Sequence, residues 1–527
     1  MRSRTVSLPR AELRQGRRRV AAIAGAFAIL AALTQFPMAA DAATPKHGGT
    51  LNVAATSMQS NMSPTQIGVG YEDAGTTAAA IYGYLAYLTP KDGSVHLQFL
   101  RSITPSKGDK VWTLVLHSGI QFSDGTPLNA AAIRYTLQQM SSPNSGDPNF
   151  KIIETWREQV VNATTLKITL PQADSGFPAE VTQYFPWIGS PTAWQKAGIN
   201  FGTNPVGAGP FKLQSWTQNA QMTLVPNPYY KNFAPGQPYL DKIVVNEASQ
   251  PSQLISALQS GQDQAAWLQG RTQFNDAKAA GMNVQEVLAS GGEYLLFNTA
   301  KPPFNNLLAR KAVSDALNHQ QLASVWSPGT TPFMNLFAPS SPYYNKANNF
   351  SGTNTAEAMK LFSQLHSQGV NMNFSFVTVT TYAASADYLQ ATLDKYPGVH
   401  VTPQLENISQ YIADAKDGNF GIFAFGLNFA NPWPSVPSTF GPTGGANFGH
   451  WVDPKVTQAL NKISHSESPA VLKKNYNIIA KEMATQEPIY PAQDSELAYA
   501  TTKSVQNVQT IEYGATPLVA QMWLSNS

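Results

Sequence analysis

Two stretches in the first third of the chain place a large apolar residue at every second position. In residues 111–116 and again in residues 166–170, every second side chain is large and apolar. This period of two predicts strands with at least one buried face. Between them, Asn129 precedes a run whose apolar residues recur at helical spacing, so we expect a helix capped by the Asn129 side chain.

The second half of the chain alternates strand-like and helix-like segments. Strands are expected at residues 373–379, 399–402 and 420–427, and helices at residues 384–395 and from Asn407 to Gly418. Successive strand–helix–strand units form right-handed crossovers, which make a parallel sheet with helices on both faces. The pattern therefore predicts an α/β unit in this half of the chain.

Ligands of open parallel sheets bind beyond the carboxyl ends of the strands. In this sequence those ends are residues 380–382 and 428–433. We therefore expect a ligand site that uses Tyr382 together with Asn428, Phe429, Asn431 and Trp433.

The first 42 residues follow the order of a secretory signal. Seven arginines precede an apolar run at residues 20–33, and the small residues of the triplet 40–42 follow. The run of 14 residues is shorter than the roughly 20 that a spanning helix needs, so a cleaved signal peptide at residues 1–42 is expected and not an anchor. The consecutive arginines at 17–19 leave both Sec and twin-arginine export open.

The leader accounts for the basic charge of the chain. The whole sequence carries +3, and residues 1–42 hold seven arginines against Glu12 and Asp41, which leaves −2 for the remainder. A basic nucleic-acid-binding surface is therefore not expected. The sequence contains no cysteine, which excludes disulfides, a cysteine-based zinc site and a lipid-modified cysteine. We expect a periplasmic protein that is not lipid-anchored.

Short motifs in a fixed order extend over nearly everything after residue 42. They are residues 47–51, residues 111–137 with Phe122-Ser123-Asp124-Gly125-Thr126-Pro127, and residues 207–211, 227–230, 238–241, 296–299, 302–305 and 487–491. Each motif is weak alone. Together they resemble family 5 of the extracellular solute-binding proteins of ABC importers, the group that binds oligopeptides, dipeptides, nickel and related compounds.

The resemblance implies an α/β, two-lobed periplasmic-binding-protein fold, with the ligand cleft between the lobes and an extra subdomain in the first lobe. The first lobe would comprise residues 43–290, with the extra subdomain at about 76–204, and residues 490–527 would complete it. The second lobe would comprise residues 291–489. Two hinge crossings would join the lobes, which would close on the ligand.

The same resemblance implies the function. The protein would bind a peptide or peptide-like solute and deliver it to an inner-membrane permease that a cytoplasmic ATPase drives. It would act as a monomer and would need no cofactor, metal or catalytic residue.

Two departures from the family pattern concern the ligand. Peptide-binding members typically carry an Asp that pairs with the amino terminus of the ligand, and the matching position here is Asn428; the family's Asp-Pro is Asn431-Pro432. An amide hydrogen-bonds without contributing a full charge. The chain also has no arginine after Arg310, so the second lobe lacks the side chain best suited to hold a carboxylate. A non-peptide solute, such as an opine, a sugar, a modified peptide or a metal chelate, therefore stays open.

Aromatic residues supply further candidates. Tyr71 and Trp451 join Tyr382 and Trp433, because a flat ring covers an apolar or sugar-like ligand face at low entropic cost. The earlier tryptophans are expected to pack in the interior; they are Trp112, Trp156 and Trp216.

Other chemistry receives little support. Residues 207–209 read Gly-Ala-Gly but continue into a strand-like segment, which indicates a turn and not a phosphate loop. Neither a Gly-x-Ser-x-Gly elbow nor a His-Glu-x-x-His motif is present. A metal chelate could still meet a single side chain such as His450. An exported enzyme or a chaperone on the same fold is the less favoured alternative, since fold does not fix function.

Overall fold

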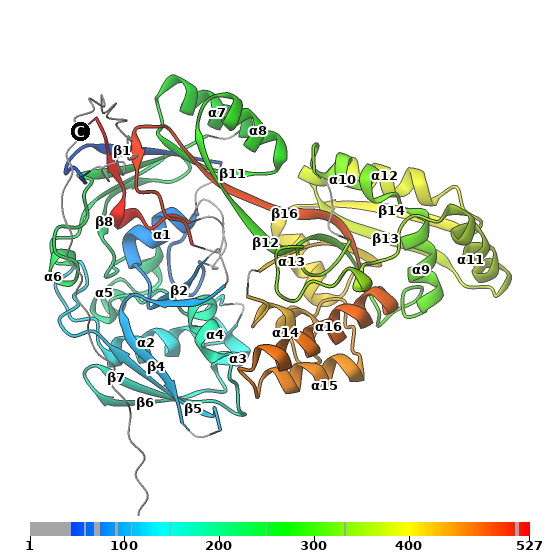
Figure 1. Cartoon of the computed structure of the whole chain (residues 1–527), viewed down its shortest axis with the longest axis horizontal. Helices are drawn as coiled ribbons and strands as arrows, with labels where there is room; N and C mark the ends of the chain where they lie inside the picture. The colour runs from blue at the N-terminus through cyan, green and yellow to red at the C-terminus, as the bar shows by residue number, and fades with distance from the viewer. Residues whose placement is uncertain are drawn as a thin grey trace, which may run out of the picture. The chain divides into compact units, whose positions relative to one another are not determined.

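A ten-stranded sheet runs through the computed structural model, in the order β14-β13-β15-β12-β16-β11-β1-β10-β9-β8 (Figure 1). The structure describes residues 44–526 apart from 57–58, 68–73, 90–92, 107, 148, 249, 331–333, 430 and 512–515. The expected leader at residues 1–42 and the candidate Tyr71 lie outside the described residues. None of the described helices has the length and apolar content needed to cross a bilayer.

The buried apolar side chains gather in clusters that fall into two groups. Three clusters use residues between 51 and 287 and between 497 and 524. Two clusters use residues between 294 and 492. We call these two parts the first lobe and the second lobe. The exact boundaries of the lobes and of the extra subdomain at 76–204 stay predictions.

The first lobe holds one end of the ten-stranded sheet and a separate four-stranded sheet. Its strands in the large sheet are β1 (Thr50–Ala55), β8 (Phe211–Thr217), β9 (Gln221–Pro226), β10 (Lys242–Glu247) and β11 (Ala265–Gln269). The four-stranded sheet has the order β4-β5-β7-β6, and these strands are Leu100–Pro105, Val111–Leu116, Thr165–Thr169 and Arg157–Asn162. Both strands predicted at 111–116 and 166–170 are confirmed, and they pair with each other.

Helices and short strands complete the first lobe. The helices are α1 (Ala74–Tyr82), α2 (Ala130–Met140), α3 (Phe150–Ile153), α4 (Phe177–Tyr184), α5 (Pro191–Ala197), η1 (Gly198–Thr203), α6 (Tyr230–Phe233), α7 (Pro251–Ser260), α8 (Arg271–Ala279) and η5 (Val519–Gln521). The strands are β2 (Ala86–Leu88), β3 (Val95–Leu97), β17 (Val505–Gln506) and β18 (Trp523–Leu524). The predicted cap of α2 is confirmed, because Asn129 Oδ1 accepts the Ala132 N–H at 2.9 Å.

The second lobe is the α/β unit that the second half of the sequence predicts. Strand β13 (Met372–Val379) pairs in parallel with both β14 (Val399–Glu406) and β15 (Ile422–Phe429). Side chains of α9 (Leu307–Ala316), α10 (His319–Trp326), α11 (Thr355–Ser367) and α12 (Ala383–Leu393) share a cluster on one face. Side chains of α13 (Ile408–Asp417), α14 (Ser435–Phe440), α15 (Pro454–Ile463) and α16 (Pro469–Gln486) share a cluster on the other. The short helices η2 (Lys346–Asn348) and η3 (Thr380–Tyr382) lie between these elements in the chain.

The last strand of this unit corrects one prediction. The expected strand at 420–427 is instead Ile422–Phe429, so Asn428 and Phe429 belong to the strand and not to the loop after it. The reason is tertiary, because Asn428 and Phe429 continue the antiparallel pairing of β15 with Gly291 and Ser290 of β12.

Two long strands connect the lobes. Strands β12 (Asn283–Phe297) and β16 (Ile489–Thr501) pair with each other on both sides of an irregularity between Leu288 and Gly292. At this crossing Gly291 and Gly292 have φ angles of +93° and +141°, which L side chains rarely adopt. A Cβ on Gly291 would lie 1.8 Å from the Leu427 carbonyl oxygen. The crossing point therefore requires glycine.

Candidate functional site between the lobes

The carboxyl end of β15 leads directly to the first lobe. Asn428 is half-buried on the strand, and the side chain of Phe429 is 1% exposed and packs edge-on against Phe337 at 5.9 Å. Two residues further on, Asn431 Nδ2 donates to the Gly93 carbonyl of the first lobe at 3.3 Å, and its Oδ1 accepts the Trp433 N–H at 3.0 Å. Asn431 thus joins the two lobes and also shapes the turn that presents Trp433.

Trp433 lies against the first lobe at the start of α4. A Cβ placed on Gly176 would be 2.2 Å from Cδ1 and 2.3 Å from Nε1 of the Trp433 indole. Only a residue without a side chain leaves room for the ring at this point. The ring of a second-lobe residue therefore packs on the bare backbone of the first lobe.

Hydrogen bonds surround this contact. The Ser175 N–H donates to the Ser464 carbonyl at 2.8 Å, and Ser175 Oγ donates to the Ile463 carbonyl at 3.2 Å. Ser435 Oγ, at the start of α14, donates to Gln183 Oε1 of α4 at 3.3 Å. In Figure 1, α4 likewise lies next to α14. The lobes are in direct contact along residues 174–183 of the first lobe and residues 431–435 and 463–465 of the second.

Two carboxyl groups lie beside the indole. Burial raises the pKa of Asp174 to about 6, while the Gly176 N–H, which donates to Asp174 Oδ1 at 2.7 Å, limits the rise. Burial raises the pKa of Glu180 well above its usual range, and the neighbouring Asp174 charge adds to the rise. The buried Trp433 Nε1 favours the charged form of both groups, although no hydrogen bond of standard geometry joins it to either.

On the hinge side, α8 holds both connecting strands. Arg271 Nη1 donates to Glu286 Oε2 of β12 at 3.0 Å, and Arg271 Nε donates to Glu496 Oε1 of β16 at 3.0 Å. The next residue, Thr272, donates its hydroxyl to the Pro328 carbonyl of the second lobe at 2.9 Å. These contacts fix the direction in which the chain crosses between the lobes.

The remaining candidates lie apart from this contact. Tyr382 is half-buried and its ring lies 4.8 Å from that of Trp326, on the face of the sheet that α9–α12 cover. Trp451 is 6% exposed and belongs to the opposite cluster, and its backbone N–H donates to Asn447 Oδ1 at 3.1 Å. Asn428, Phe429, Asn431 and Trp433 lie close together along the chain at the end of β15, whereas Tyr382 and Trp451 pack in two separate clusters. The role of all six residues as ligand contacts stays a prediction. Trp112 and Trp156 are buried and Trp216 is half-buried against the first-lobe core, as expected.

The one arginine of the second lobe lies apart from the contact between the lobes. Arg310 is buried, with Nε donating to the Gln486 carbonyl at 2.9 Å and Nη1 to the Phe304 carbonyl at 2.7 Å. Its role is to tie α9 to the end of α16. Asn428 and Asn431 therefore offer amide groups at a sheet end to which no arginine of this lobe contributes.

The residues that oppose Trp433 were not identified from the sequence. Ser175, Gly176 and Glu180 lie more than 250 positions from Trp433, and nothing in their local pattern marks them. A Gly-Phe-Pro at the start of a helix indicates only a helix start.

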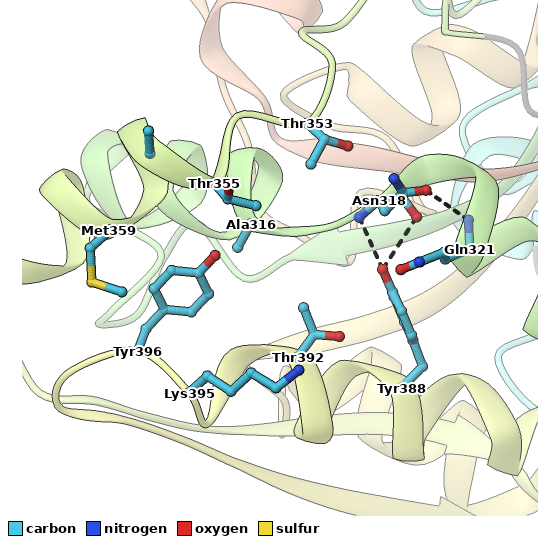
Figure 2. Close-up of a pocket in the computed structure, with 11 residues that line it drawn as sticks. Ala316, Asn318, Gln321, Thr353, Thr355, Met359, Tyr388, Thr392, Lys395 and Tyr396 are labelled. Atoms are coloured by element: carbon cyan, nitrogen blue, oxygen red, sulfur yellow. Dashed lines mark hydrogen bonds between the residues drawn. The ribbon is translucent and has the colours of Figure 1, made fainter.

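A pocket lies in the second lobe between helices α9, α10 and α11 on one side and α12 on the other (Figure 2). Its volume is about 560 Å³, and Figure 2 shows Tyr388 and Tyr396 on one side and Thr353 and Asn318 on the other. Tyr388 Oη accepts the Asn318 N–H at 3.0 Å. None of the residues that join the lobes lines this pocket, so it is distinct from the site described above.

Known proteins match both the sequence and the fold. Residues 94–447 match the family model of the bacterial extracellular solute-binding proteins, family 5 Middle. The glutathione-binding protein GsiB of Salmonella typhi is 30% identical over 263 residues, which are 48% of this chain and 50% of that protein. GsiB of Escherichia coli O1:K1 / APEC is 31% identical over 252 residues, 46% of this chain and 48% of that protein. The chain thus spans about half the length of these curated relatives.

Solved structures share the fold at lower identity. The oligopeptide-binding protein AppA of Bacillus subtilis, in complex with a nonapeptide, has a TM-score of 0.77 and 17% identity and covers 92% of this chain and 100% of its own. AgaA of A. tumefaciens R10, with agropinic acid, has a TM-score of 0.79 and 19% identity over 90% and 99% of the two chains. DppA of Helicobacter pylori, with the peptide STSA, has a TM-score of 0.78 and 20% identity over 91% and 98%.

The expected α/β, two-lobed periplasmic-binding-protein fold is therefore confirmed. Since the family model covers well over half of the chain, this protein belongs to family 5 of the bacterial extracellular solute-binding proteins.

Proposed function

We propose that the protein is the exported substrate-binding component of an ABC importer, which encloses a peptide or peptide-like solute between its lobes and delivers it to an inner-membrane permease. One observation carries this proposal. A chain of the solute-binding family 5 has two lobes that the strands β12 and β16 join and that also touch where Trp433 packs on Gly176. Such a connection suits hinge closure around a ligand.

The solute is proposed to meet amide groups and aromatic rings at the second lobe. Asn428, Asn431 and Trp433 are the residues we assign to it, with Tyr71 from the first lobe. Amide groups both donate and accept hydrogen bonds, so they suit the peptide bonds of a short or modified peptide better than a free ammonium. The GsiB relatives bind glutathione, according to their name, which agrees with a short peptide-like solute.

The proposal includes a cleaved leader at residues 1–42, a monomer in the periplasm without a lipid anchor, and no catalytic step. N-terminal sequencing of the exported protein tests the first part, with Ala43 as the expected first residue. A mature protein that kept the apolar segment 20–33 would contradict it.

The ligand is tested by native mass spectrometry of protein purified from its own host, followed by calorimetry. We expect a bound molecule with the mass of a short peptide or peptide-like compound, and its removal should lower the melting temperature of the protein. A ligand at 100 times its Kd stabilises the folded state by about 2.7 kcal/mol. A binding role would be contradicted if no solute co-purified and no compound of peptide, opine, sugar and chelate libraries raised the melting temperature.

A second candidate solute is an opine or another non-peptide molecule. It is favoured by the neutral pair Asn428 and Asn431 and by the likeness to AgaA, whose structure holds agropinic acid. Recovery of ordinary free peptides from the native protein would exclude it.

A further inference from the structure

We propose that the two lobes carry a latch that closes the empty protein without a ligand, and that the carboxyl pair Asp174 and Glu180 makes this latch tighten in acid. The latch consists of residues 174–183 of the first lobe and residues 431–435 and 463–465 of the second. The inference goes beyond the proposed function, since it concerns the empty protein and depends on no particular solute.

The latch is a direct contact between the lobes. The Trp433 ring rests on the backbone of Gly176, and no space remains between them for a side chain at position 176. Ser175 adds two hydrogen bonds to the carbonyls of Ser464 and Ile463. These interactions need no third molecule, so they stabilise the closed form of the protein on their own.

Lobe closure depends on pH because it buries two carboxyl groups. Burial is the main cause of the raised pKa of both carboxyl groups, and the charge of Asp174 adds to the rise at Glu180. Trp433 Nε1 limits the rise at both groups, and the Gly176 N–H, Glu180 and His465 after α15 limit it at Asp174. The charge of Asp174 in turn reaches Tyr476 of α16. Trp433, His465 and Tyr476 all belong to the second lobe. When the lobes separate, these neighbours leave and water reaches the carboxyls.

The direction of the pH effect follows from the raised pKa values. A free carboxyl has a pKa near 4, whereas in the closed form the pKa of Asp174 is about 6 and that of Glu180 is well above its usual range. Closing therefore takes up protons. The ratio of closed to open protein falls by up to about tenfold per pH unit for each proton, from about pH 4 to the raised pKa of each group.

Because the sequence contains no cysteine, spin labels attach only at cysteines that are introduced. Spin labels on Ile199→Cys and Met359→Cys, two exposed side chains on different lobes, report the distance between lobes by electron–electron double resonance. The solute-free protein is measured at pH 5, 6, 7 and 8. We expect a closed population without solute, which shrinks as the pH rises. If the solute-free protein shows the open distance alone at every pH, the latch does not exist.

Gly176→Ala tests the steric contact. Gly176 has a φ of −82°, which alanine adopts readily, so the first lobe should fold normally. Its new methyl group would collide with the Trp433 ring, and the closed population should fall at least tenfold at every pH. Gly352→Ala is the matched control, because a Cβ there meets nothing within 4 Å. Equal distance distributions for Gly176→Ala and the unmodified protein would contradict the proposal.

Glu180→Gln tests the proton uptake. The amide keeps the shape of the protonated acid, so we expect a closed population that no longer changes above pH 6. Asp315→Asn is the control, because burial also raises the pKa of Asp315 to about 6 but this residue lies on α9, outside the latch. It should keep the pH response of the unmodified protein. If Glu180→Gln titrates like the unmodified protein, the pair is not the switch. All these distances are measured on the solute-free protein. They therefore test the latch even if the search for a solute fails.

Discussion

Arg271 Nε and Nη2 both lie 3.0 Å from one oxygen of Glu496, whose side chain is 5% exposed. The same guanidinium also binds Glu286, so one side chain of α8 joins the two strands that cross between the lobes. Arg271→Ala should lower the free energy of unfolding by about 1–3 kcal/mol at pH 7.5, because a buried carboxylate loses its partner. Urea unfolding measures this change.

The loss should be smaller at pH 5. Burial already raises the pKa of Glu496, and Arg271 counteracts that rise. Without Arg271 the carboxyl protonates more readily, and the unpaired charge disappears in acid. Lys360→Ala is the control, since its pair with Glu357 is solvent-exposed and should contribute less than about 0.5 kcal/mol. An equal effect of both variants would contradict the role of Arg271.

Asn428→Asp tests the ligand end of β15. A carboxylate at this position should improve the affinity for solutes with a free ammonium at least tenfold and weaken the affinity for acidic solutes, because charge-assisted hydrogen bonds are stronger than neutral ones. Calorimetry with matched amidated, acetylated and free peptides measures the change in preference. Asn354→Asp makes the same chemical change at the cap of α11 and should leave binding unaltered. An unchanged preference in Asn428→Asp would place the solute elsewhere.

Gly291→Ala tests the crossing between the lobes. The left-handed backbone and the Leu427 carbonyl oxygen at 1.8 Å leave no position for a methyl group, so β12 must separate from β15. We expect a loss of more than about 3 kcal/mol in unfolding free energy or failure to fold. Thermal unfolding followed by circular dichroism measures it. A melting temperature within a degree of the unmodified protein would show that the crossing tolerates a side chain.

Asp147→Asn should remove a pH dependence of stability. The side chain is 5% exposed, and burial raises the pKa of Asp147 to about 7 although the Asn149 N–H donates to it. A folded-state pKa above the unfolded value makes the native state less stable as the pH rises from about 4 to 7. The variant should therefore gain about 1–3 kcal/mol over the unmodified protein at pH 8 and little at pH 4. Urea unfolding at both values checks the difference, and a constant difference would exclude this carboxyl as the cause.

Local signals sufficed where local interactions decide the structure. Asn129 caps α2, and the apolar spacing places β13, β14 and their helices, because the cap and the buried face both lie within the segment. The end of β15 was misplaced by two residues, since its last pairs form with Gly291 and Ser290 far away in the chain. Pairing partners of this kind leave no local pattern.

In the candidate site, one side was proposed from the sequence and the opposite side was not. Asn428, Asn431 and Trp433 were chosen by the rule that ligands meet the carboxyl ends of parallel strands, and as ligand contacts they stay predictions. Their opposite surface could not be inferred, because a glycine that accommodates an indole resembles any glycine before a helix. Trp451 is 6% exposed and packs in the interior, so its role as a ligand contact stays a prediction.

The long strand β16 constrains how the chain reaches its native state. Residues 497–501 fill the gap between β11 and β12, so the sheet of the first lobe stays incomplete until β16, more than 200 residues after β11, has been synthesised. Contacts over such sequence separations slow folding. The first lobe therefore cannot complete its sheet during the synthesis of its N-terminal part, and its unpaired strand edges stay exposed until the late segment arrives.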